Sequence, residues 1–123
     1  MNLRPIHLLA LLVVLGACDR YDVQRDETLR QQLAGMRSAM TRFRVDQGRD
    51  PHSLDELVPK YLRAIPVDPF TQSSTTWRVT TEETVPPSSD FQTGTVAAAT
   101  SVVIEVRSAA PGADRNGVLY SNY

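Results

Sequence analysis

The chain has little of the material from which metal and catalytic centres are built. Its 123 residues include one cysteine, Cys18, and two histidines, His7 and His52. A single cysteine excludes an internal disulfide and a cysteine-rich zinc site. His52 lies next to Ser53 and near Asp55, but a serine at a helix cap and an aspartate on the same short helix leave no group to orient a base. We therefore predict that the protein is not an enzyme and acts on no small-molecule substrate.

The chain also lacks a surplus of either charge. Its 13 Lys and Arg residues and 14 Asp and Glu residues give a net charge of -1. Nucleic-acid binding and polybasic attachment to membranes both need a basic surplus, so we predict neither. An independent core usually needs about 100 residues or more, so the length allows one domain.

No apolar run is long enough to cross a bilayer. Residues 6–17 are apolar except for one histidine, whereas a transmembrane helix needs about 20 residues. A short basic start followed by such a run is typical of a secretory signal peptide. An uncleaved anchor helix is the other interpretation, but Asp19, Arg20 and Asp22 should cut the run off too early for it.

Residues 15–18 read Leu-Gly-Ala-Cys. Small residues before the only cysteine resemble the lipobox of bacterial lipoproteins, in which the cysteine thiol is diacylated and the signal is cut before it. The alternative is an ordinary signal peptide that ends near a cysteine. We predict a signal peptide over residues 1–17, lipidation at Cys18 and a mature domain over residues 18–123, anchored stably if it carries two or more acyl chains.

The mature chain begins with a helical pattern. Between Gln24 and Gln47 there is no proline, and apolar residues recur at spacings of four and three, which predicts one helix that ends at Gly48. This apolar stripe is Leu29, Leu33, Met36, Met40 and Phe43. We expect it to pack on a sheet; a short coiled-coil seam is the alternative.

Turns and strands follow the helix. Residues 53–56 read Ser-Leu-Asp-Glu, which predicts a capping box and a helix of about two turns. β-rich segments predict strands at residues 76–80, 97–107 and 118–120, with a loop over residues 82–94. The predicted fold class is α+β: a long N-terminal helix packed on an antiparallel sheet of about three strands.

Four segments together resemble one known family. Residues 46–57 read D-Q-G-R-D-P-H-S-L-D-E-L, residues 61–70 read Y-L-R-A-I-P-V-D-P-F, residues 76–77 read T-W, and residues 117–123 read G-V-L-Y-S-N-Y. The order and spacing resemble the soluble domain of type II secretion pseudopilins of the G type. The resemblance implies a pilin-like head. The chain lacks the family's G-F-T-L-I-E start and full hydrophobic stem, so its anchor resembles a lipoprotein's instead.

The resemblance also implies a candidate metal loop. In the family, the loop between the last strands binds calcium through Ser and Asp side chains and backbone carbonyls. The matching residues here are Ser108, Asp114 and Asn116. Calcium takes six to eight oxygen ligands, and the alternative is a turn held by its own hydrogen bonds.

The predicted function is that of a lipid-anchored, pseudopilin-like structural component or accessory of a type II secretion system, working by protein–protein contact. We expect partner contacts on an outer helix face, where Arg30, Arg37 and Arg44 recur at heptad spacing. An acid directly after a lipidated cysteine, here Asp19, resembles a signal for retention at the periplasmic face of the inner membrane; ordinary surface polarity is the alternative. The other functional hypothesis is a lipid-anchored binding module that uses the fold outside secretion.

Overall fold

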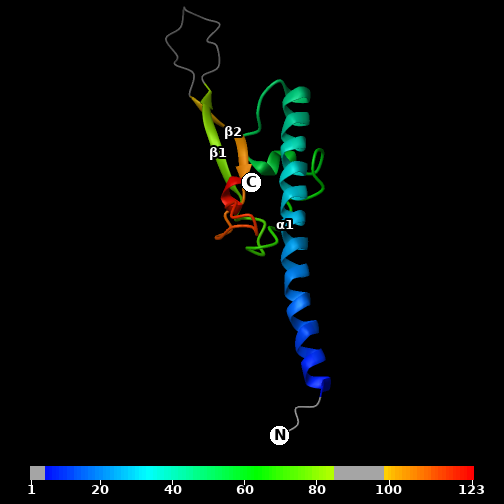
Figure 1. The fold of residues 1–123 in the computed structure, drawn as a ribbon. Coiled ribbons are helices and arrows are strands. Elements are labelled where there is room, and N and C mark those ends of the chain that lie inside the picture. The colour runs from blue at the N-terminus through cyan, green and yellow to red at the C-terminus, as the bar shows by residue number, and fades with distance from the viewer. Residues whose placement is uncertain (1–4, 85–98) are drawn as a thin grey trace, which may run out of the picture.

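The computed structural model describes residues 5–84 and 99–123, and the side chains of residues 22–84 and 99–123. One long helix, α1 (Pro5–Gln47), lies beside a small antiparallel sheet (Figure 1). It ends where the sequence predicts: Gly48 has a φ of +70°, which favours glycine, and its amide donates to the Arg44 carbonyl at 2.9 Å.

The start of α1 differs from the expectation. The apolar pattern predicts a helix from Gln24 to Gln47, whereas the backbone is already helical from Pro5 and continues through Asp19, Arg20 and Asp22. Charged residues are compatible with a helix even where they are costly in a membrane. Among the residues that the structure describes, no helix is both long and apolar enough to span a membrane.

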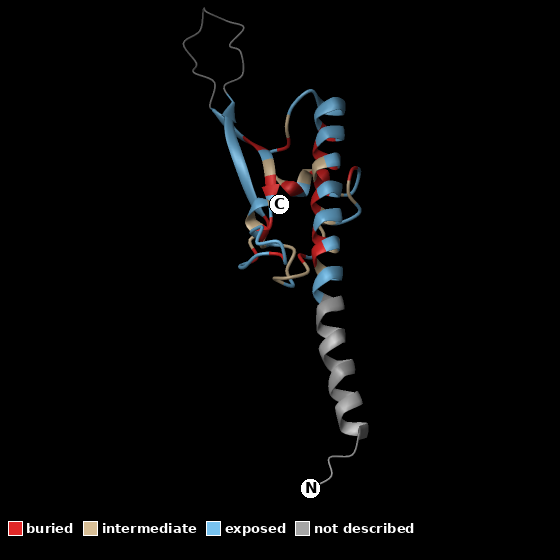
Figure 2. Ribbon diagram, in the orientation of Figure 1, coloured by how far each residue is buried: buried red, intermediate tan, exposed pale blue. Residues whose placement is uncertain are grey.

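The apolar stripe forms the centre of the core, as expected. Its five members are each 5 % exposed or less, and they pack with Val103 and Val106 of the sheet and with Trp77, which directly precedes a strand. Figure 2 shows the buried positions of α1 on the side that faces the sheet. The prediction that the stripe packs inward is confirmed, and Trp77 is a core residue whose indole N–H donates to the Pro66 carbonyl at 2.8 Å.

The sheet has two strands among the described residues. β1 (Arg78–Thr84) pairs antiparallel with β2 (Thr100–Arg107), with Val79 opposite Val106 and an irregularity between Thr80 and Thr81. β2 contributes the buried residues and lies on the helix side of β1, which is exposed throughout (Figure 1). Residues 82–84, predicted as the start of a loop, therefore belong to β1, and the remainder of the predicted loop and positions 97–98 lie outside the described residues.

The predicted third strand is wrong. In place of a strand at residues 118–120 there is a single bridge between Ala113 and Leu119, followed by the 3₁₀ helix η2 (Tyr120–Asn122). The cause is the Asp114 side chain, which accepts the amide of Val118 at 2.9 Å. That amide is consequently not free to join a strand ladder.

The predicted capping box is also wrong. The segment forms one 3₁₀ turn, η1 (Leu54–Leu57), and the Ser53 side chain makes no capping hydrogen bond. The Glu56 carboxylate instead accepts from Arg49 at 3.0 Å, so it does not reach back to Ser53. Leu54 and Leu57 are buried as expected. The fold is therefore α+β, with one long helix packed on a two-stranded antiparallel sheet.

Candidate functional site

The predicted lipidation site lies in α1. Cys18 belongs to the helical backbone, and its side chain lies outside the part of the chain whose side chains are described. Cleavage and acylation are processing steps, so the boundary at residue 18 and the modification of Cys18 both stay predictions.

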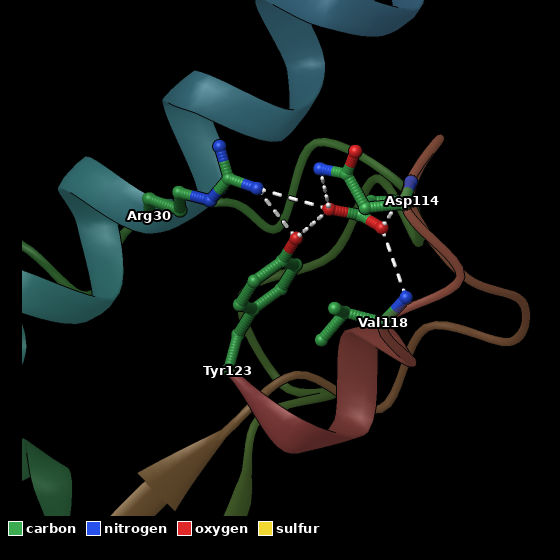
Figure 3. Close-up of polar contacts among 5 residues, drawn as sticks. Arg30, Asp114, Val118 and Tyr123 are labelled. Atoms are coloured by element: carbon green, nitrogen blue, oxygen red, sulfur yellow. Dashed lines mark hydrogen bonds and ion pairs between the residues drawn. The ribbon is translucent and has the colours of Figure 1, made fainter.

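The candidate calcium loop is organised around one carboxylate, which we call the Asp114 cluster (Figure 3). Asp114 Oδ2 accepts from the Tyr123 hydroxyl at 2.6 Å and from Arg30 Nη2 at 3.1 Å. Asp114 Oδ1 accepts from the amides of Asn116 at 2.8 Å and Val118 at 2.9 Å. The Asp114 side chain is 1 % exposed. Donors from α1, the turn and the C-terminal residue therefore share one buried anion.

These donors hold the carboxylate in its charged form. The hydrogen bond from Tyr123, followed by the one from the Val118 amide, lowers the pKa of Asp114 to about 2. Protonation would weaken all of these bonds at once, so the cluster couples the C-terminus to α1 only while Asp114 is ionised.

Acid should therefore weaken the fold through Asp114. Because its pKa is about 2 in the folded state and about 3.9 unfolded, its contribution is complete above about pH 5 and disappears as the pH falls through about 4 to about 2. We expect the stability difference between wild type and Asp114→Asn, from urea unfolding, to be constant above pH 5 and to shrink below pH 4. Tyr123→Phe removes the strongest donor and raises the folded pKa of Asp114 toward its unfolded value, so the loss should be smaller and should be complete at a higher pH. A difference that is the same at pH 5 and pH 2 would contradict the assignment.

The structure does not bring the three candidate calcium ligands together. Asn116 lies with Asp114, but the Ser108 hydroxyl donates to Asp68 Oδ2 at 2.6 Å. Hydrogen-bond donors, not an open oxygen shell, surround Asp114. Within the described residues no group of three or more His, Cys, Asp and Glu side chains is placed to hold a metal. Calcium binding stays a prediction, and the turn held by its own hydrogen bonds accounts for the geometry seen.

The side chains of the three arginines are 42–55 % exposed on α1, and each also pairs with an acid of the domain. Arg30 is part of the Asp114 cluster. Arg37 Nε donates to Glu105 at 2.9 Å, and its Nη2 reaches the carbonyl of the C-terminal residue. Arg44 Nε donates to Asp50 at 2.6 Å. Their long side chains reach from α1 across to the rest of the domain, where carboxylates lie. Their role in partner binding stays a prediction, but charge reversal would set like charges against these acids.

A cavity of about 610 Å³ opens beside the Asp114 cluster, and we call it the acidic cavity. It lies between the first described side chains of α1 and the turn before η2, and it is lined by Asp22, Val23, Asp26, Ala113, Asp114, Arg115 and Tyr120. Tyr120 hydrogen-bonds to Asp26; burial, followed by this bond, raises the pKa of Tyr120 to about 12. Tyr120 therefore stays a protonated donor at every physiological pH.

Sequence reasoning missed two buried acids. The sequence places Asp26 near the start of a helix and Asp68 in a proline-rich connector, and neither position indicates burial. In the structure Asp26 is 6 % exposed and Asp68 is 0 % exposed. The Asp-Pro-Phe sequence at residues 68–70 carries a signal for Asp68, because aspartate accepts amide hydrogen bonds from the residues that follow it. Asp26 carries no local signal.

The residues that could suggest a hydrolytic trio do not form one. The ring Nδ1 of His52 lies 3.0 Å from the carbonyl oxygen of Ser101 in β2, so it donates to the backbone. Ser53 makes no side-chain cap and Asp55 is exposed on η1. Their contacts are those of a surface turn.

No family model, no curated protein and no solved structure matches the chain.

Proposed function

We propose that the protein is a lipid-anchored, pseudopilin-like component or accessory of a type II secretion system. It is held at the periplasmic face of the inner membrane through Cys18 and acts by protein–protein contact. The motifs at residues 46–57 and 61–70 support the pilin-like interpretation of the head.

The observation that carries the proposal is the continuity of α1. The same helix contains Cys18 and supplies the stripe at the centre of the core. The first core residue of the stripe, Leu29, follows Cys18 by only 11 residues, or about 16 Å of helix. A helix of that length would hold the head close to the membrane and in a defined orientation, which suits a subunit that docks onto neighbours in an envelope assembly.

The alternative is a lipid-anchored binding module outside secretion. The acidic cavity is the observation that favours it, because a cavity lined by several charged side chains is suited to a ligand. The two functions predict different partners. Affinity purification from crosslinked membranes should recover secretion-system subunits under the first proposal, and deletion of the gene should reduce the set of secreted proteins. Normal secretion in the deletion strain would favour the binding module.

Lipidation gives the most direct test of the anchor. Wild-type protein should incorporate labelled palmitate and sediment with membranes, whereas Cys18→Ser should do neither, because the thiol is the acceptor of the glyceride. Ser38→Ala, an exposed change on the same helix, should behave as wild type. If the wild type takes up no label, or if Cys18→Ser stays equally membrane-bound, the lipid anchor is wrong.

A further inference from the structure

The acidic cavity contains a carboxylate oxygen that the fold does not satisfy. Asp26 is 6 % exposed, and its Oδ1 has no hydrogen-bond partner among the described residues. Burying a charged oxygen without a partner is costly, and folded proteins rarely keep such groups without a reason. Asp26 lines the cavity, but Oδ1 itself has almost no accessible surface, so a partner in the cavity can bond this oxygen only if the Asp26 side chain turns toward it.

The other two acids of the cavity differ from each other in how much hydrogen-bond acceptor capacity they have left. Asp114 lines the same cavity, but its two oxygens accept bonds from both side chains and amides. Asp22, one helical turn before Asp26, lies 3.9 Å from Arg25 in a long ion pair, and its side chain is 68 % exposed. Asp22 and Asp26 lie on the same side of α1, since residues four apart are neighbours on a helix. The cavity thus offers two carboxylates with acceptor capacity left over.

We propose that the acidic cavity binds the guanidinium group of an arginine side chain from a partner protein. The planar guanidinium has five donors in a fixed fork, so it can bond Asp26 Oδ1 and an oxygen of Asp22 at the same time. This inference rests on the part of the proposed function in which the protein binds a partner protein. It does not depend on the lipid anchor or on a role in secretion.

Other cations fit the cavity less well. The described residues place no three metal-ligating side chains together, so a divalent cation would keep most of its water. A lysine ammonium is a strongly hydrated point charge and cannot span two carboxylates as a fork does. Arginine is also enriched at protein interfaces, whereas lysine is depleted there.

One residue of the cavity opposes the ligand. Arg115 lines it and carries the same charge as the proposed guest. Removing that charge should strengthen binding, while removing the charge of Asp26 should weaken it. The two substitutions therefore predict opposite changes in one measured affinity.

The test is a titration of the full-length, ¹⁵N-labelled chain in micelles of an uncharged detergent with a blocked Gly-Arg-Gly tripeptide, followed by amide NMR shifts. We expect saturable shifts at Val23, Asp26 and Ala113. Asp26→Asn should weaken binding by about tenfold or more, the effect of one lost charge-assisted hydrogen bond. Asp22→Asn should weaken it less and Arg115→Gln should strengthen it. Asp55→Asn, an exposed change on η1, should have no effect.

Three further titrations separate the possible ligands. The matched tripeptide with citrulline, which has the shape of arginine without its charge, should not bind, and the lysine tripeptide should bind more weakly than the arginine one. Equal binding of the lysine peptide would overturn the guanidinium assignment. Calcium chloride that shifts the same amides and displaces the peptide would overturn it in favour of a metal. Absence of saturable shifts with the arginine peptide would overturn the site.

Thermal unfolding gives an independent readout. If Asp26 is kept for a ligand, Asp26→Asn should leave the unfolding temperature unchanged or raise it. The asparagine oxygen can still accept the Tyr120 hydroxyl, and a neutral amide is cheaper to bury than a carboxylate with one unbonded oxygen. A lower unfolding temperature would mean that the carboxylate serves the fold, and would overturn the proposal. Asp22→Asn, at an exposed position, still tests binding if Asp26→Asn does not fold. Because the peptide is free in solution, failure here leaves the secretion function untouched, and normal secretion in a deletion strain leaves this site untouched.

Discussion

Replacing Phe43 by alanine should lower the free energy of unfolding by about 3–5 kcal/mol, the usual cost of an aromatic cavity in a core. Phe43 is 4 % exposed and packs edge-on against Tyr61, with ring centroids 5.3 Å apart. The guanidinium of Arg49 lies 5.1 Å from the Phe43 ring centroid, on the solvent side of the core. Since a domain of this size has a total stability of about 5–15 kcal/mol, the change is a large share of it.

Trp77 provides the measurement, because it is the single tryptophan of the chain and is buried. Its fluorescence during urea unfolding should give a lower midpoint for Phe43→Ala. Val45→Ala is the matched control: it lies two residues further along α1 and is 78 % exposed, so its effect should stay within about 0.5 kcal/mol. An unchanged midpoint for Phe43→Ala together with lost association would place the stripe against a partner, contrary to its position in the core.

The inward face of α1 was predictable because it depends on periodicity alone. Spacings of four and three place Leu29 to Phe43 on one side of a helix whatever the partner is, and an apolar side must be covered. Gly48 was predictable for a similar reason, since a positive φ at a helix end favours glycine. These signals are local, so the sequence contains them in full.

The third strand and the capping box were not predictable because competing side-chain hydrogen bonds decide them. Val118 has strand propensity, but its amide is bonded to Asp114, which Tyr123 and Arg30 in turn hold in place. Glu56 has the spacing of a capping residue, but Arg49 takes its carboxylate. In both places a side-chain hydrogen bond outweighs a secondary-structure preference of about 1 kcal/mol or less.

The acidic cavity was beyond sequence reasoning for the same reason. Asp22 and Asp26 look like ordinary exposed acids at the start of an amphipathic helix, where they suit its dipole. The turn at residues 113–115, about 90 positions later, lies beside Asp26 in the fold, where Asp26 is buried and its Oδ1 has no hydrogen-bond partner among the described residues. The heptad arginines show the same limit, because exposed positions on a helix do not reveal which acids their long side chains pair with.

Replacing Asp68 by alanine is expected to have an effect as large as the loss of Phe43. Asp68 is fully buried, and its Oδ1 accepts from the amides of Phe70 at 2.8 Å and Thr71 at 3.2 Å. Its Oδ2 accepts from the Ser108 hydroxyl at 2.6 Å. Alanine would orphan three donors, each at a cost of about 1 kcal/mol or more, so we expect a loss of about 3–5 kcal/mol in urea unfolding.

Three controls separate the lost hydrogen bonds from a general effect of changing an acid. Asp55→Ala, at an exposed site, should change stability by no more than about 0.5 kcal/mol. Asp68→Asn should recover part of the loss, since its amide oxygen still accepts from Phe70 and Thr71. In the double variant with Ser108→Ala, the cost should be less than the sum of the single costs, because both changes remove the same bond. Strict additivity, or a loss below about 1 kcal/mol for Asp68→Ala, would mean that this carboxylate does not tie the connector at residues 65–70 to the end of β2.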